Sequence, residues 1–207
     1  MNMIIQALSR IKAAHSTAGF TMIELLIVIS IIGILAVAVL SAISPVEQIN
    51  RGRDTGSQSD AEQLLSAIDR FHAYQGYYPW FVKPDSTTAL GWTKVDATWK
   101  DDHATSKCPV YEKLSTATTT GCNGSNELKS TFFSRIFASG YNSLYASRKT
   151  GQGSSVYICF LPQSAAFAKK AQDRCGTSGN GLPTDVSDAA KAEICDDTDK
   201  QYMYCLP

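Results

Sequence analysis

The hydrophobic residues of this chain are concentrated in one long run near the N-terminus. Residues Leu25 to Leu40 read LLIVISIIGILAVAVL, and the apolar run extends from Phe20 to Ile43 with Glu24 as its one charged residue. As a helix rising about 1.5 Å per residue, this segment would be roughly 36 Å long, which is enough to cross a bilayer with some tilt. The pattern therefore predicts a membrane-spanning helix.

A second, amphipathic helix is predicted directly after this run, within residues 44–76. Pro45 cannot keep its intrahelical hydrogen bond, so a kink or local unwinding is expected there. Residues 47–75 then place apolar side chains at i, i+3, i+4 and i+7, and Gly76 is the expected stop. The predicted apolar face consists of Ala61, Leu64, Leu65, Ile68, Phe71 and His72.

The rest of the chain, residues 77–207, is predicted to form a globular head. Its first residues, 77–80, are aromatic or proline, and we expect them to fasten the helix end to the head, although an aromatic binding patch is an alternative. Residues 81–130 show no sustained period and read as a long connecting region. Apolar residues on one face between Leu128 and Phe137 predict a short helix.

Strand and helix signals alternate through the second half of the head. Residues 143–148 and 155–161 flank a glycine-containing turn, which indicates a hairpin, and the second strand is apolar on both faces and therefore central. Residues 164–175 predict a helix that begins at Ser164 and ends at Gly176, and 186–195 a shorter one. Residues 202–206 form a candidate edge strand. The expected fold class is α+β, with the long N-terminal helix packed on a small antiparallel sheet.

Composition and charge argue against nucleic-acid binding and catalysis. The 207 residues suffice for one ordinary domain plus an extra element, and 19 basic residues balance 19 acidic ones, so no positive excess points to nucleic acid. No nucleotide-binding loop or hydrolase motif is present, and His15, His72 and His103 have no adjacent motif. We therefore predict that the protein is not an enzyme and needs no cofactor.

An acidic run near the C-terminus, between Asp185 and Asp199, admits two interpretations. Calcium is bound by six to eight oxygens from a loop, and this run is rich in carboxylates. It lacks the ligand spacing of an EF-hand, which favours a solvated acidic face, so we assign no metal ligand. Asn123-Gly124-Ser125 has the form of a glycosylation sequon, a triplet that also arises by chance.

All six cysteines follow the apolar run. An even number on one side of a membrane segment indicates disulfides in an oxidising compartment, whereas six free buried thiols would indicate the cytosol. No Cys-x-x-Cys pair or zinc-like spacing occurs. Fifteen pairings are possible. Proximity in the sequence and the expected strands favour Cys108–Cys122, Cys175–Cys195 and Cys159–Cys205.

Orientation follows from the residues that precede the apolar run. Arg10 and Lys12 lie there without any acidic residue, so the positive-inside tendency keeps the N-terminus cytoplasmic. An ordinary secretory signal is the rival interpretation, with cleavage near residues 36–38.

The stretch AGFTMIELLIV, residues 18–28, distinguishes between these interpretations. It resembles the class III signal of type IV pilins and type II secretion pseudopilins, and the order of a helix, a glycine and Tyr-Pro later in the chain is also similar to these proteins. The resemblance implies that a prepilin peptidase cuts after Gly19, removes the leader 1–19, and methylates the new amine of Phe20. The glutamate at the fifth mature position is Glu24.

Glu24 admits two roles. A carboxylate at the edge of a membrane helix either reaches the interface or finds a positive partner. The resemblance implies the second role, in which the Phe20 amine approaches a neighbouring subunit's Glu24 in a helical filament and sets its register.

The resemblance implies a structural subunit of a type IV pilus-like filament, serving adhesion, motility or DNA uptake. It would reside in the inner membrane through residues 20–43 before assembly, with lipid, a prepilin peptidase and a membrane assembly platform as partners, and then enter an extracellular or periplasmic filament. The alternatives are a pseudopilin of a secretion system and a signal-anchored enzyme or receptor.

Overall fold

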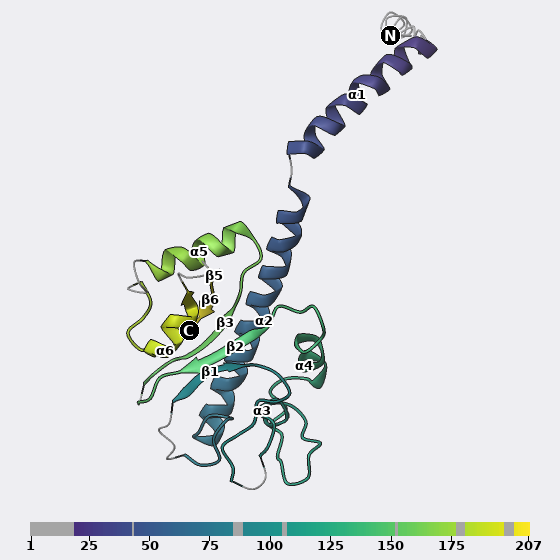
Figure 1. Cartoon of the computed structure of the whole chain (residues 1–207). Coiled ribbons are helices and arrows are strands. Elements are labelled where there is room, and N and C mark those ends of the chain that lie inside the picture. Colours follow the sequence, from purple (N-terminus) through teal and green to yellow (C-terminus); the bar gives the residue numbers. More distant parts are fainter. Residues whose placement is uncertain are drawn as a thin grey trace, which may run out of the picture. The chain divides into compact units, whose positions relative to one another are not determined.

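The computed structural model describes residues 19–42, 44–84, 89–104, 107–151, 153–176, 181–196 and 201–207. The chain forms two compact units, one ending at Ser44 and one running from Pro45 to Pro207 (Figure 1). The division falls at the Ser44–Pro45 step, where the sequence predicts a break. Ile43, the expected end of the membrane segment, lies outside the described residues.

The first unit contains one helix, α1, from Met22 to Ala42. It is built almost entirely of aliphatic residues around its whole circumference, so it has no polar face that would suit water. The second unit begins with α2, from Pro45 to Gln75. Pro45 occupies the first helical position, where its missing N–H has no intrahelical partner to lose. Gly76 ends the helix with φ +78°, as expected for a left-handed terminating glycine.

The sheet of the second unit is antiparallel and has four strands in the order β1-β2-β3-β6. Their bounds are Leu90–Lys94 for β1, Leu144–Arg148 for β2, Val156–Phe160 for β3 and Tyr204–Leu206 for β6. The expected hairpin is confirmed, because Leu144 pairs with Phe160 in the β2–β3 ladder. Every residue of β3 is buried, which confirms its central position. Two short strands, β4 (Cys195–Asp196) and β5 (Gln201–Tyr202), pair separately.

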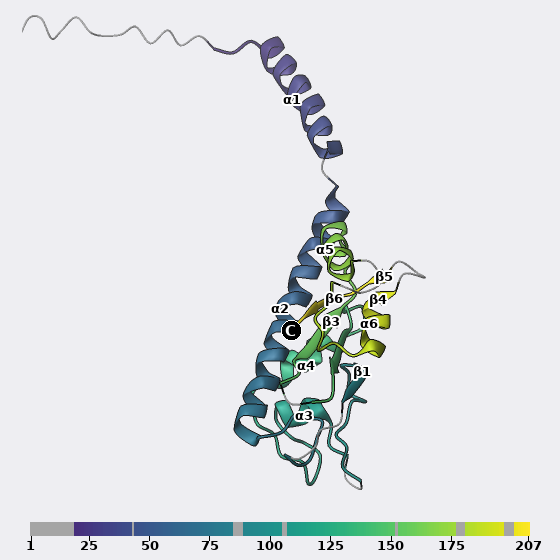
Figure 2. The same ribbon diagram turned by 90° about the vertical axis from the view of Figure 1, so that its left-hand side faces the viewer.

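Helices α2 (Pro45–Gln75) and α6 (Asp188–Ile194) lie on opposite faces of the sheet (Figure 2), and each face buries its own cluster. Helix α2 covers one face with Leu64, Ile68 and Phe71, which are at most 2% exposed. The other face buries Tyr157 and the Cys159–Cys205 pair against α6. The remaining helices are α3 (Val110–Leu114), α4 (Ser130–Ile136), α5 (Ala165–Cys175) and α6 (Asp188–Ile194).

A buried carboxylate fixes α5 to α2. Asp54 is 0% exposed, and its oxygens accept hydrogen bonds from the backbone N–H groups of Gln163 and Ser164 and from the Ser164 hydroxyl, at 2.6 to 3.1 Å. Ser164 in turn accepts from the N–H of Phe167 and caps α5. Two turns earlier on α2, Glu47 accepts from the N–H of Ala165 at 3.1 Å. The first turns of α2 are therefore part of the head.

A second polar cluster organises the long connection between β1 and α4. Lys113 is 7% exposed, and its ammonium donates to Asp101 at 3.0 Å and to the Phe81 carbonyl at 2.7 Å. Burial lowers the pKa of Lys113, and the bond to Asp101 opposes that shift. Burial alone would raise the pKa of Glu112, but hydrogen bonds from Thr118 and Thr119 outweigh it and lower the pKa to about 2.

The structure contains two elements in the region that the sequence predicts to be a long connection. Residues 81–130 contain β1 and α3, which are too short for a periodic signal. The predicted strand 202–206 is divided, because Tyr202 belongs to β5 and residues 204–206 form the edge strand β6. The predicted buried face of α2 is confirmed for Ala61, Leu64, Ile68 and Phe71, whereas the buried Asp54, Ser57, Asp60 and Ala67 were not expected.

Candidate functional site

The N-terminal segment places the predicted processing residues just before the first helix. Gly19 and Phe20 are exposed and lie outside regular structure, and α1 begins at Met22. A backbone that is exposed and non-helical is accessible to a peptidase, which must bind an extended segment in its active site. Of the predicted leader, only Gly19 is among the described residues.

Thr21 and Glu24 form a reciprocal cap at the start of α1. The Glu24 N–H donates to the Thr21 hydroxyl oxygen at 3.2 Å, and the Glu24 carboxylate accepts from the Thr21 N–H at 3.0 Å and from its hydroxyl at 2.7 Å. This is the capping box, in which two helix-terminal N–H groups are satisfied by side chains. The Thr-x-x-Glu spacing before an apolar run is the sequence signal of this cap, and the predictions from the sequence did not include it.

The capping box gives Glu24 a local partner that the two roles considered from the sequence did not include. The carboxylate is held back over the first turn, next to the peptide group that joins Phe20 to Thr21. Cleavage after Gly19 would convert the neighbouring Phe20 nitrogen into an amine. The described contacts of the carboxylate are to Thr21, the residue that follows Phe20.

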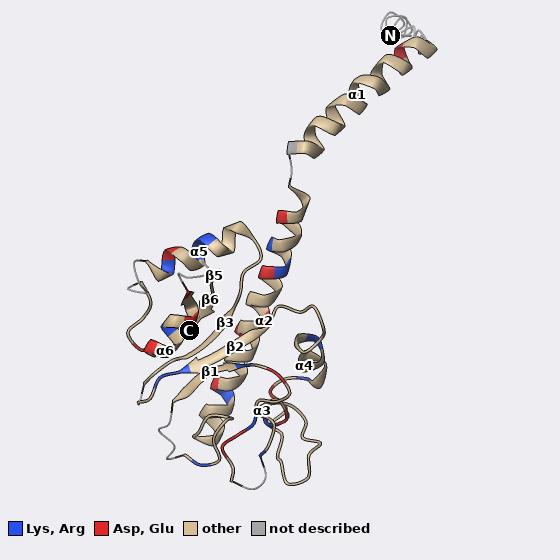
Figure 3. Cartoon of the chain, viewed as in Figure 1, with Lys and Arg blue, Asp and Glu red and all other residues tan. Residues whose placement is uncertain are grey.

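The rest of α1 is apolar and exposed. It contains one candidate membrane span, Met22–Ser41, and no part of its hydrophobic window is buried. Figure 3 shows acidic colour near the start of α1, and the acidic residue in the first turn of this helix is Glu24. The two hydroxyls of the span, Ser30 and Ser41, donate to the carbonyls of Ile27 and Ala38, so they require no partner outside the helix.

Three disulfides brace the second unit. They join Cys108 to Cys122, Cys159 to Cys205 and Cys175 to Cys195, which are the pairs that the sequence favours. The second of them links directly opposed residues of β3 and β6. Cys108–Cys122 closes the connection that contains α3. Cys175–Cys195 closes the segment between the end of α5 and the start of β4.

Two further candidate residues, His72 and Asp185, make contacts within the second unit. The His72 ring stacks on Tyr78 with 4.1 Å between centroids. Asp185 accepts from the Tyr157 hydroxyl and the Ser155 N–H, and the bond from Tyr157 is the main reason that its pKa is lowered. Asp197 and Asp199 lie outside the described residues. Among those described, no group of three or more His, Cys, Asp or Glu could hold a metal ion.

Comparison with known protein families assigns the N-terminal segment. Residues 15–40 match the prokaryotic N-terminal methylation motif. The chain carries the class III signal of type IV pilins and pseudopilins. The match includes Gly19, Phe20, the capping box and most of α1. No curated protein and no solved structure matches the chain.

The methylation motif supports a type IV pilin-like or pseudopilin-like precursor. It implies processing by a prepilin peptidase and assembly from the membrane in general terms, and it belongs to structural rather than enzymatic proteins. Together with the apolar α1, it indicates a single-pass, membrane-anchored protein.

Proposed function

We propose that the chain is the precursor of a structural pilin, which assembles through α1 into a type IV pilus-like filament. The observation that carries the proposal is the methylation motif at residues 15–40, in register with an apolar helix that buries none of its hydrophobic window. Such a helix needs lipid around it in the membrane and copies of itself in a filament. In this proposal the N-terminus is cytoplasmic, and the second unit is exported.

Processing is proposed to occur between Gly19 and Phe20, with methylation of the Phe20 amine. Mass spectrometry of the N-terminal peptide from membranes that contain a prepilin peptidase tests this. The expected N-terminus is N-methylated Phe20. Gly19→Val should leave the leader attached, because a branched side chain replaces glycine at the cut site, whereas Ala18→Ser is the control and should be processed. An intact leader on the wild-type chain, or a terminus near Val39, would refute the proposal.

Glu24 is proposed to act in assembly by pairing with the Phe20 amine of a neighbouring subunit. Two substitutions separate this role from capping. Glu24→Gln keeps an oxygen that accepts from the Thr21 N–H but removes the charge, and Glu24→Val removes both. If the charge matters, both variants insert normally and both lose filaments.

Ser30→Val supplies a matched control, because it also replaces a polar residue of α1 with an apolar one. In the described structure the Ser30 hydroxyl donates to the Ile27 carbonyl within the same helix. The filament yield of Ser30→Val should therefore be unchanged. If Glu24→Gln forms filaments normally and Glu24→Val does not, the carboxylate acts only as a helix cap. That result would contradict the pairing role.

The motif is shared with pseudopilins, and the choice of a pilin rests on the second unit. Its three disulfides resemble the cysteine-braced C-terminal regions of pilins. Electron microscopy of fibres sheared from the cell surface tests the choice. A pilin should give long fibres that contain this chain, whereas a pseudopilin should give none at its natural expression level.

A further inference from the structure

A pocket on the second unit lies at the edge of β1 that faces away from β2. Its volume is about 520 Å³, and its walls are β1, residues 80–81 and residues 98–102. Among the described residues, β1 pairs with β2 and with no other strand, and its other edge borders this pocket. All three tryptophans of the chain, Trp80, Trp92 and Trp99, line it.

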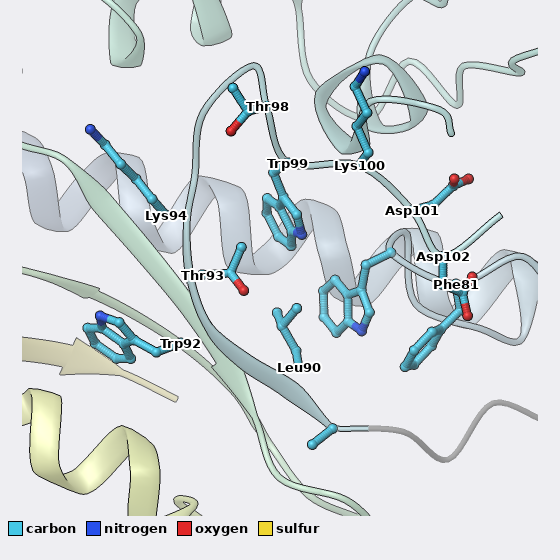
Figure 4. Close-up of a pocket in the computed structure, with 12 residues that line it drawn as sticks. Phe81, Leu90, Trp92, Thr93, Lys94, Thr98, Trp99, Lys100, Asp101 and Asp102 are labelled. Atoms are coloured by element: carbon cyan, nitrogen blue, oxygen red, sulfur yellow. The ribbon is translucent and has the colours of Figure 1, made fainter. Parts of the chain in front are cut away.

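The floor of the pocket is aromatic and apolar. The rings of Trp80 and Trp99 stack with centroids 5.7 Å apart, and both residues are more than nine-tenths buried. Figure 4 shows Leu90, Thr93 and Trp99 on one side of β1 and Trp92 on its other side. Trp92 stacks there on Tyr145. Indole rings therefore border the pocket on both sides of the strand edge.

The walls are fixed before any ligand binds. The Asp102 N–H donates to the Trp80 carbonyl at 3.1 Å. Lys113 bridges the same two segments from behind, since its ammonium bonds both Asp101 and the Phe81 carbonyl. A preformed pocket avoids the entropic cost of ordering its walls on binding.

The polar groups of the pocket suit a ligand that carries hydroxyls. The indole N–H of Trp80 is buried and has no acceptor among the residues that the structure describes. The Thr93 and Thr98 hydroxyls donate to the Gly91 carbonyl and to Asp96, which leaves their oxygens able to accept. Since Lys113 forms an ion pair with Asp101, the remaining charged residues of the wall are Lys94, Lys100 and Asp102, with a formal net charge of +1.

We propose that this pocket binds a neutral saccharide. A pyranose ring has an apolar C–H face that packs on indole and a rim of hydroxyls that both donate and accept, which matches the floor and the threonines. An extended peptide that pairs with the edge of β1 is less suited, because the strand bulges between Leu90 and Thr93 and its ladder is irregular there. The site goes beyond the proposed filament role and does not depend on polymerisation.

Intrinsic fluorescence tests the proposal directly, because every tryptophan of the chain lines this pocket. The full chain is titrated with maltose, cellobiose, lactose and N,N′-diacetylchitobiose in lauryldimethylamine oxide, a detergent without a sugar headgroup. At least one disaccharide should change the emission, and this change should saturate with a Kd of about 1 mM. Saturation-transfer NMR should report binding of the same sugar. If none of the four binds, or if only extended peptides do, the proposal is wrong.

Thr93→Val locates the binding. Valine has the shape of threonine and keeps its strand preference but lacks the hydroxyl, so affinity should fall about fivefold. Thr116→Val, the same change at an exposed threonine outside this pocket, is the control and should bind like the wild type. Equal affinity of Thr93→Val and wild type would place the sugar elsewhere and overturn the assignment.

Discussion

The contact between Asp54 and the start of α5 should be one of the largest single contributions to the stability of the second unit. Asp54→Ala removes a carboxylate that is fully buried and accepts from two backbone N–H groups and one hydroxyl. The Ser164 N–H and hydroxyl belong to a residue that is 1% exposed, so water cannot replace their hydrogen bonds without rearrangement.

The magnitude follows from the number of donors left without an acceptor. A buried polar group that loses its partner costs about 1–3 kcal/mol, and hydrogen bonds to charged groups lie toward the upper end. Two backbone N–H groups in partly buried positions give about 3 kcal/mol for Asp54→Ala. For a domain of this size, that corresponds to a fall in Tm of roughly 6–12 °C. Asp54→Asn should cost less, because one amide oxygen still accepts.

Urea unfolding of the oxidised fragment Pro45–Pro207, followed by circular dichroism, measures the free energy of unfolding. Glu47→Ala is the graded control: it removes a carboxylate that accepts from the N–H of Ala165 at the same helix start, but in an exposed setting, so it should lower the stability much less than Asp54→Ala does. An Asp54→Ala variant no less stable than Glu47→Ala would refute the reasoning that burial makes this contact strong.

The other predictions concern acid stability, a disulfide and the boundary of the head. The lowered pKa of Glu112, about 2 against an ordinary 4.5, contributes about 3 kcal/mol above pH 4.5 and is lost progressively as the pH falls toward 2. Glu112→Gln should remove that pH dependence, and equal acid-unfolding slopes in the two proteins would contradict it. Replacing Cys159 and Cys205 by alanine removes a disulfide that spans 46 residues. In a chain-entropy account this should lower the free energy of unfolding by about 4 kcal/mol, which the same urea titration measures. An unchanged midpoint would show that the disulfide does not stabilise the second unit. The fragment Pro45–Pro207 should be soluble and unable to form fibres, as judged by sedimentation and electron microscopy. A fragment that begins at Arg51 should be less stable because it lacks Glu47, and fibres from either would show that α1 is not required.

Much of the architecture could be predicted from local patterns. Local sequence determines the apolar helix α1, the break at Pro45 and the helix end at Gly76, because helix formation and termination depend on neighbours within a turn or two. The helix α5 between Ser164 and Gly176 follows the same logic. The class III signal was recognisable for a related reason, since a peptidase reads a short extended segment rather than a folded surface.

Only the tertiary structure shows which residues far apart in the sequence contact one another. Asp54 looks like one more polar residue of an amphipathic helix, and only the approach of Ser164, far along the chain, makes it a buried cap. The three tryptophans are scattered over residues 80–99 without a periodic pattern, and folding gathers them at the edge of β1. Hydrophobic period and turn residues specify local conformation, whereas partners across the chain are chosen by how the whole core packs, and a single sequence carries no local sign of that choice.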